Sequence, residues 1–189
     1  MPSRDGRSRY VARSMDDVDS INLALLALRC GVGAVMLAHG INHIFGGGKI
    51  AGTARWFASL GMKPGIVHAW LASLTEVAGG AMLVLGLLTP LGGAAVIGVM
   101  LVAIVTNHRG NGFFIFRPGE GWEYVMTLTI TGFVIAILGA GEWSLDNALD
   151  LFQPNPGRDG LLIALVAGVG GAAALLAIAW RPEKKPADG

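Results

Sequence analysis

Five long apolar stretches constrain the fold of this chain more than any other feature of its sequence. They cover residues 21–45, 68–88, 91–106, 122–140 and 161–180. A helix needs about 20 mostly apolar residues to cross the hydrocarbon core of a bilayer. Backbone polar groups in lipid have to bond to one another, so apolar stretches of this kind fold as helices. The sequence therefore predicts an all-α, polytopic membrane protein.

The amino-acid composition agrees with a location in the membrane. Charged residues make up only 14% of the chain, against about 25% in average soluble proteins. The 29 glycines among 189 residues are roughly twice the usual share, and small residues let helices pack closely in lipid. A net charge of +1 gives no positive field, so we expect no nucleic-acid partner. The single cysteine, Cys30, excludes an internal disulfide.

The apolar stretches divide the chain into five parts. These are a polar N-terminal tail (1–20), a four-helix transmembrane bundle (21–140), a connecting loop (141–160), a fifth C-terminal transmembrane helix (161–181) and a polar tail (182–189). Ser20 is the expected N-cap of the first helix, since its side chain can accept a bond from a free helical N–H. Pro154 and Pro156 favour a hinge between the bundle and the last helix.

The connection after the first span has the pattern of a short helix. Apolar or small residues recur there at helical spacing, at Ile50, Ala54, Phe57 and Gly61. Trp56 lies in the same segment, and tryptophan is enriched at the membrane–water interface. We therefore predict a short interfacial helix after the first span.

Alternating crossings place all four histidines at one face of the membrane. If the N-terminus lies on side A, the first and third spans end on side B, where the second and fourth begin. The histidines, which then lie on side B or just inside it, are His39, His43, His68 and His108. Trp56 and Trp122 are the expected interfacial aromatic residues of the same side. This pattern indicates side B as the place for a functional site.

Two ionisable residues lie well inside apolar stretches. Arg29 and Glu76 are each about two turns into their helices, from opposite sides of the membrane. A charge near the bilayer centre costs a few kcal/mol, so it should face protein or water and find a partner. The two are therefore candidates for an intramembrane ion pair. Such a pair would be either an interhelical clamp or part of a proton or quinone site.

His39 and His43 share one helix face, because they are four residues apart. Such a pair can ligate a metal ion, or one of its members can bind a haem. No HExxH pattern and no second cysteine accompany them, and interfacial histidines can bond to loop carbonyls instead. We therefore expect neither a metal site nor a haem.

A series of short motifs runs through residues 22–140. They are His39-Gly40, Trp56-Phe-Ala-Ser-Leu-Gly-Met62 with Pro64-Gly65, Glu76-Val-Ala-Gly-Gly80, Thr89-Pro90, His108, Asn111-Gly-Phe-Phe114 and Gly121-Trp-Glu-Tyr124. In this order and spacing they resemble the DoxX family of small integral membrane proteins. The resemblance implies a four-helix core, from which the fifth helix of this chain departs.

The DoxX resemblance also implies a redox context in the plasma membrane of a prokaryote. The family is similar to the membrane subunit of thiosulfate:quinone oxidoreductase, which passes electrons from a sulfur compound to quinone. Other members are linked with thiol and oxidative-stress proteins. The shared motifs carry the candidate quinone or proton site, which comprises His39, Glu76, His108, Asn111 and Glu123.

Three functions follow as alternatives. In the first, the chain is an accessory subunit of a respiratory, sulfur-oxidising or oxidative-stress complex and binds quinone without a covalent bond. His39 or His108 would then bond to a quinone carbonyl, and Glu76 or Glu123 would supply protons. Any catalysis would be that of a quinone-linked oxidoreductase acting with partner subunits. In the second, the chain is a non-catalytic anchor or assembly factor for a larger membrane complex, and in the third a small transporter.

Overall fold

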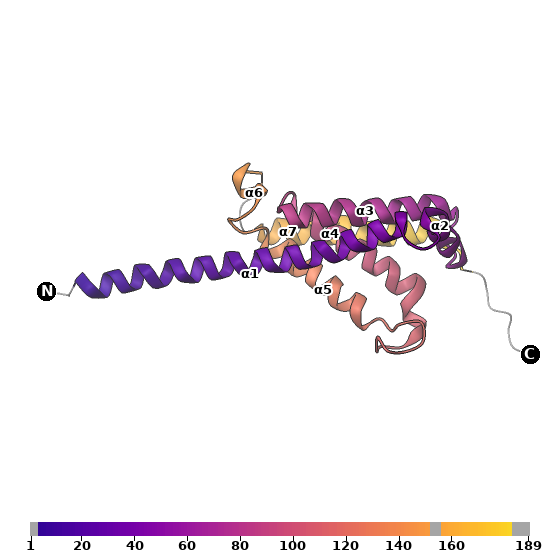
Figure 1. The fold of residues 1–189 in the computed structure, drawn as a ribbon, viewed down its shortest axis with the longest axis horizontal. Helices are drawn as coiled ribbons and strands as arrows, with labels where there is room; N and C mark the ends of the chain where they lie inside the picture. The colour runs from indigo at the N-terminus through magenta and orange to yellow at the C-terminus, as the bar shows by residue number, and fades with distance from the viewer. Residues whose placement is uncertain (1–3, 152–155, 183–189) are drawn as a thin grey trace, which may run out of the picture.

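A computed structural model gives a helical fold for the residues that it describes, 4–151 and 156–182 (Figure 1). Its α-helices are α1 (Arg4–Phe45), α2 (Lys49–Ser59), α3 (Gly65–Leu85), α4 (Thr89–Ala103), α5 (Glu123–Leu138), α6 (Leu145–Ala148), α7 (Gly157–Ile163) and α8 (Gly171–Ala179). The π segment η1 (Ile104–His108) and the 3₁₀ turn η2 (Arg109–Asn111) extend α4. The π segment η3 (Ala164–Gly170) joins α7 to α8.

Four helical segments in the described ranges are long and apolar enough to cross a membrane. They are Asp17–Phe45, Gly65–Leu85, Thr89–Asn111 and Gly157–Ala179. α5 is apolar as well but has only 16 residues, and it ends at Gly139, which has a φ of 79°. The structure thus gives four segments of crossing length where the sequence predicts five. The expected fourth span corresponds to α5, which is shorter than the others.

Successive long helices run in opposite directions along the bundle (Figure 1). α1 ends beside α2, α3 returns, α4 runs out again, and α5 returns before the final segment from α7 to α8. Side A is therefore the end that holds the α3–α4 turn and α6. Side B is the end that holds α2, which lies where the sequence predicts a short helix.

α1 begins well before the position expected from the sequence. Ser20 lies inside the helix rather than at its N-cap, because the helix continues back to Arg4. No glycine or proline occurs from Arg7 to Cys30, so the two residue types that most disfavour a helix interior are absent from this stretch. Residues 4–20 of the expected polar tail thus form a helical extension of the first span (Figure 1).

Glycines bring α1 and α3 into close contact. A methyl group on Gly33 would lie 2.8 Å from the carbonyl oxygen of Gly80, and one on Gly40 would lie 2.8 Å from that of Ser73. Neither position has room for a side chain, as is typical of closely packed membrane helices. These two contacts fix the antiparallel register of α1 against α3.

Arg29 holds the side-A end of this helix pair together. It is 2% exposed, and its Nη1 donates to the carbonyl oxygens of Leu83 at 3.1 Å and Val84 at 2.8 Å. Its Nη2 donates to the carbonyl oxygen of Trp143. The last carbonyls of a helix have no partner within the helix, and a cation there is stabilised by the helix dipole. Arg29 therefore caps the C-terminal end of α3.

Asp146 provides the matching cap for the start of α4. Its carboxylate accepts the backbone N–H groups of Leu88 at 2.6 Å and Thr89 at 2.9 Å. Its own backbone N–H donates to the carbonyl oxygen of Gly86 at 2.8 Å. A carboxylate at a helix N-terminus satisfies free N–H groups and interacts favourably with the dipole. We call Arg29 and Asp146, with the groups that they cap, the side-A junction.

The last helical segment is packed into the bundle. A Cβ on Gly168 would lie 3.0 Å from side-chain atoms of Ile97 in α4, so η3 and α4 are in close contact. At the side-B end, the indole Nε1 of Trp180 donates to the carbonyl oxygen of Leu60 at 3.0 Å. Pro154, which belongs to the expected hinge, lies outside the described residues.

Replacing Arg29 with methionine should destabilise the protein, because the carbonyls of Leu83 and Val84 would lose their donor in an apolar environment. Each buried acceptor left unpaired costs about 1–3 kcal/mol. We therefore expect Arg29→Met to lower the free energy of unfolding by about 3 kcal/mol. Denaturant titration of the detergent-solubilised protein, followed by tryptophan fluorescence, measures this change.

The control for this experiment is the same substitution at Arg158, an exposed residue of α7. Surface substitutions usually change stability by less than about 0.5 kcal/mol, so Arg158→Met should have little effect. Equal losses of stability in the two variants would contradict the capping role of Arg29.

Candidate functional site

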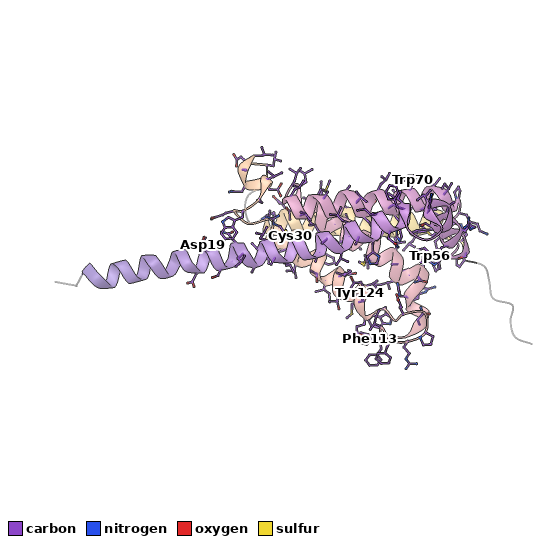
Figure 2. The ribbon with its side chains drawn as sticks, viewed as in Figure 1. Asp19, Cys30, Trp56, Trp70, Phe113 and Tyr124 are labelled. Carbon is purple, nitrogen blue, oxygen red and sulfur yellow. The ribbon has the colours of Figure 1, made fainter. Side chains whose placement is uncertain are left out.

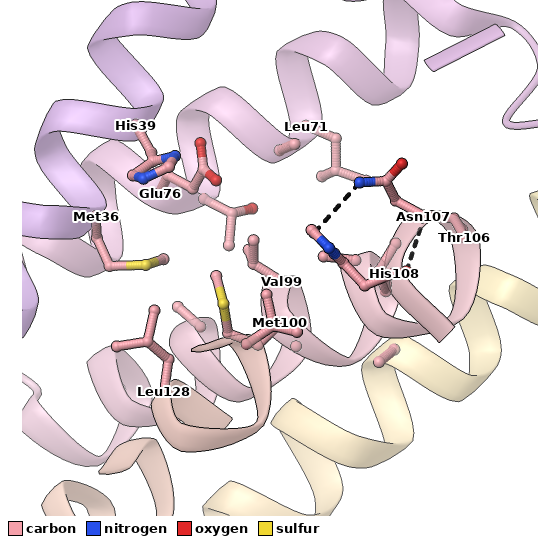
Figure 3. Close-up of a pocket in the computed structure, with 18 of the residues that line it drawn as sticks. Met36, His39, Leu71, Glu76, Val99, Met100, Thr106, Asn107, His108 and Leu128 are labelled. Carbon is pink, nitrogen blue, oxygen red and sulfur yellow. Dashed lines mark hydrogen bonds between the residues drawn. The ribbon is translucent and has the colours of Figure 1, made fainter. Parts of the chain in front are cut away.

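A cavity of about 760 Å³ lies between the helices and reaches side B (Figure 3). Pockets for small organic molecules typically have about 300–1,000 Å³, apolar walls and a few polar groups. Most of the lining here is apolar, and its side chains come from α1, α2, α3, α4, α5, α8 and η1. The cavity also brings together the four histidines that the sequence places on side B, which are His39, His43, His68 and His108.

Glu76 and His43 form a polar wall of the cavity where α1 meets α3. Nδ1 of His43 lies 3.0 Å from Oε2 of Glu76, and the two side chains are 18% and 5% exposed. The contact is an ion pair whenever the imidazole is protonated. His39, one turn earlier in α1, is exposed and also lines the cavity (Figure 3). The close approach of the helices at Gly40 places these groups together, since a Cβ there would lie 3.0 Å from the Cβ of Glu76.

Several buried polar atoms in the lining lack a hydrogen bond of good geometry. They are Nδ1 of His43, Nδ1 of His68 and Oε2 of Glu76. The first and last face each other at ion-pair distance, whereas Nδ1 of His68 has no hydrogen-bond partner among the described residues. Leaving a buried polar group unpaired costs about 1–3 kcal/mol. Nδ1 of His68 is therefore available to a polar group of a ligand. In the described ranges, no three His, Cys, Asp or Glu side chains are grouped for a metal ion.

A π turn at the end of α4 holds Asn107 and His108 at the cavity wall. This turn is η1, and π turns frequently lie at functional sites. Nδ1 of His108 lies 2.9 Å from the carbonyl oxygen of Glu120, and because a carbonyl only accepts, this nitrogen carries the proton. In the neutral ring, Nε2 then accepts from Nδ2 of Asn107 at 3.3 Å. The neighbours of His108 thus select one tautomer (Figure 3).

α2 contributes an aromatic surface to the cavity. The hydroxyl of Thr53 donates to the carbonyl oxygen of His43 at 2.7 Å, which fixes α2 against the end of α1. The rings of Trp56 and Phe57 then lie 6.3 Å and 6.4 Å from the imidazole of His43, measured between centroids. An aromatic surface, in which the rings of Trp56 and Phe57 meet edge to face, therefore lies next to the polar wall of His43 and Glu76.

The structure does not bring Arg29 and Glu76 together as the expected ion pair. Arg29 binds carbonyls at the side-A end of α3, including that of Val84, whereas Glu76 contacts His43. Glu76 and Val84 are eight positions apart in α3, which is roughly 12 Å along the helix. The close contacts at Gly33 and Gly40 set the register of α1 against α3, and this register decides which side chains meet. The number of turns between each residue and the end of its helix does not predict the contact.

The structure divides the remaining predicted residues into two groups. His39, Glu76, His108 and Trp56 line the cavity, whereas Asn111, Glu123 and Trp122 are outside its lining. Asn111 donates through Nδ2 to the carbonyl oxygen of Gly119 at 2.6 Å. Glu123 accepts through Oε2 from the backbone N–H of Ile115 at 3.2 Å. These residues therefore brace the loop between η2 and α5.

Sequence reasoning did not single out His43 and His68 as site residues, although a signal for both was present. His43 shares a helix face with His39, and the crossing pattern places His68 on side B. Met36 and Met100, which also line the cavity (Figure 3), carry no such signal, because methionine fills gaps in many protein interiors.

The fold and cavity define a small multi-pass membrane protein with a ligand-sized space between its helices. Residues 24–109 match the family model of DoxX. This part of the chain therefore belongs to the DoxX family, and it includes His39, Glu76 and His108. The motifs at 111–124 lie beyond the matched range. No curated protein and no solved structure matches the chain.

The contact between His43 and Glu76 should be measurable as a coupling energy. Residues in one ion pair typically couple by 0.5–3 kcal/mol, so we expect about 1 kcal/mol between His43→Ala and Glu76→Ala. The two single variants and the double variant, each unfolded by denaturant in detergent, give this value.

A second cycle, which combines Glu76→Ala with His108→Ala, is the control. The bonds of His108 go to Asn107 and Glu120, so its coupling to Glu76 should be close to zero. Couplings of the same size in both cycles would mean that the measurement reports a general loosening of the cavity.

Proposed function

We propose that this protein is an accessory membrane subunit of a redox complex and binds a quinone-type carrier in the side-B cavity. The observation that most supports this proposal is the cavity itself, with about 760 Å³ of mostly apolar space and its histidines and Glu76 in the wall. A quinone likewise combines a large apolar part, its ring and tail, with a few polar atoms, its two carbonyl oxygens. Apolar walls with a few polar groups are how proteins bind such molecules.

The polar wall offers suitable partners for a quinone carbonyl. A carbonyl oxygen needs an N–H donor, and the buried Nδ1 of His68 can supply one in the tautomer that carries the proton there. Such a bond would remove the cost of an unpaired buried group. Trp56 and Phe57 would lie beside the quinone ring, on the surface that flanks His43.

The pair formed by His43 and Glu76 supports a role in proton supply. Reduction of a quinone takes up protons as well as electrons. A proton shared between Nδ1 of His43 and Oε2 of Glu76, which lie 3.0 Å apart, would be held next to the ligand. The electrons would come from a partner subunit, which makes this chain one part of an oxidoreductase.

We also propose that the chain crosses the plasma membrane of a prokaryote five times, with α5 as the short crossing. Support comes from the alternating directions of the helices along the bundle (Figure 1). The contact between Trp180 and Leu60 holds the end of the last helix on side B, while the extension of α1 projects from side A.

The unpaired polar atoms favour ligand binding over a purely structural role. A non-catalytic anchor needs packing surfaces only, and an unpaired imidazole nitrogen such as Nδ1 of His68 would lower its stability with no compensation. A ligand-binding subunit gains from the same atom, because the atom is free to bind.

The proposal predicts that Glu76→Gln weakens quinone binding. This change keeps the shape of the side chain but removes its charge, so the contact with His43 loses its ionic character. We expect the Kd for decylubiquinone to rise about tenfold, which corresponds to about 1.4 kcal/mol. Quenching of tryptophan fluorescence in the purified protein in nanodiscs measures this Kd.

Glu123→Gln is the matched control, because Glu123 carries a family motif but lies outside the cavity lining. Its Kd should stay within about twofold of the original value, which is less than about 0.5 kcal/mol. The proposal is wrong if the unaltered protein shows no saturable quenching, or if Glu76→Gln leaves the Kd unchanged. In that case a single stable complex with a partner in mild detergent would favour the anchor.

A further inference from the structure

The loop between η2 and α5 exposes an unusual run of apolar side chains. Four consecutive residues are involved, and the exposed fractions are 37% for Phe113, 46% for Phe114, 43% for Ile115 and 78% for Phe116. We call residues 112–121 the aromatic loop. Contiguous exposed apolar residues of this kind mark contact with a membrane or with another protein.

Because α5 is short, this loop lies closer to the middle of the bundle than the side-B end of α1 does. On side A, the chain after α5 is tied to α1, because the backbone N–H of Glu142 donates to Oδ1 of Asn22 at 2.9 Å. Phe45 lies 23 residues after Asn22 in α1, which is roughly 34 Å at 1.5 Å per residue. α5 has 16 residues, or roughly 24 Å. The start of α5, where the aromatic loop ends, therefore lies roughly 10 Å short of the end of α1.

The figures agree with this position. α5 diverges from α1 toward side B, so the loop lies to the side of the bundle and does not extend past its end (Figure 1). Phe113 lies no farther along the long axis than Trp56 of α2 (Figure 2). If α1 and α3 span the bilayer, the loop lies at the depth of its side-B interface or acyl chains.

The backbone of the loop is suited to an environment with little water. Non-helical backbone at membrane depth has to satisfy its polar groups within the protein. Five backbone hydrogen bonds do so here: Arg117 to Phe114 at 3.1 Å, Glu120 to Arg117 at 2.8 Å, Gly121 to Phe114 at 3.1 Å, Trp122 to Gly112 at 3.1 Å and Glu123 to Phe113 at 2.9 Å.

Side chains at the base of the loop satisfy further backbone groups. Asn111 donates to the carbonyl oxygens of Gly119 and Glu120, at 2.6 Å and 3.1 Å. His108 lies 2.9 Å from the carbonyl oxygen of Glu120, and Glu123 accepts from the N–H of Ile115 at 3.2 Å. A loop in water would not need this number of internal bonds, since water can pair with free backbone groups.

We propose that the aromatic loop is inserted into the side-B leaflet of the bilayer, with Phe114 and Phe116 in contact with lipid. Phenylalanine side chains of interfacial segments are buried at the boundary between the headgroups and the acyl chains. At that depth the charged group of Arg117 can reach the headgroup layer. Ile115 and Gly121 also line the cavity, so the inserted loop forms one lip of it.

The depth of Phe116 can be measured with a nitroxide spin label. The variants Phe114→Cys and Phe116→Cys are made in a Cys30→Ala background, labelled, and reconstituted into phosphatidylcholine nanodiscs. Collision rates with oxygen, which concentrates in lipid, are compared with those of a nickel chelate, which stays in water. For both labels we expect oxygen to be several-fold more effective than the chelate.

Two control positions bracket the expected result. Lys49, at the start of α2, is exposed and lies outside the candidate spans, so a label at Lys49→Cys should respond more to the nickel chelate. Ile130 in α5 is 55% exposed, and a label at Ile130→Cys should respond to oxygen. The proposal is overturned if the label at Phe116 behaves like the label at Lys49, which means water, or if it is shielded from both reagents, which means a protein contact. Phe116 is 78% exposed, so its replacement should not disturb folding.

Discussion

In lipid, every backbone polar group has to find a partner inside the protein, and this requirement accounts for the polar side chains at both ends of the bundle. On side A, Arg29 satisfies the last carbonyls of α3 and Asp146 the first N–H groups of α4. On side B, Asn111 and Glu123 do the same for the loop before α5. Arg29, Asn111 and Glu123 look functional in the sequence, yet their hydrogen bonds serve the backbone.

A second set of buried polar groups lies in the wall of the cavity. Close contact through Gly33 and Gly40 holds α1 against α3, whereas α5 diverges from them toward side B (Figure 1). The space between these helices is lined by Glu76 and His68, whose polar atoms are buried and lack good hydrogen bonds. Leaving such atoms unpaired lowers the stability of the fold, so we interpret them as groups that serve the cavity.

The sequence predicts most of the fold, because apolar length and helix breakers are local features. The end of α1 at Phe45, the short helix α2 and the common side of the histidines all follow from it. Three features do not. The partner of Arg29 depends on a register set by distant glycines, the shortness of α5 depends on the conformation of Gly139, and the role of Asn111 depends on a loop whose path has no periodic pattern.

The unbroken course of α1 has a mechanical consequence. From its start on side A, one continuous helix carries Arg29, His39 and His43 in turn. The stretch before Asp17 adds roughly 20 Å beyond the candidate span. A helix transmits rotation and translation along its axis where a coil would absorb them. A partner protein bound to this outer stretch on side A would therefore act on the same rigid helix that carries His39 and His43 in the cavity wall.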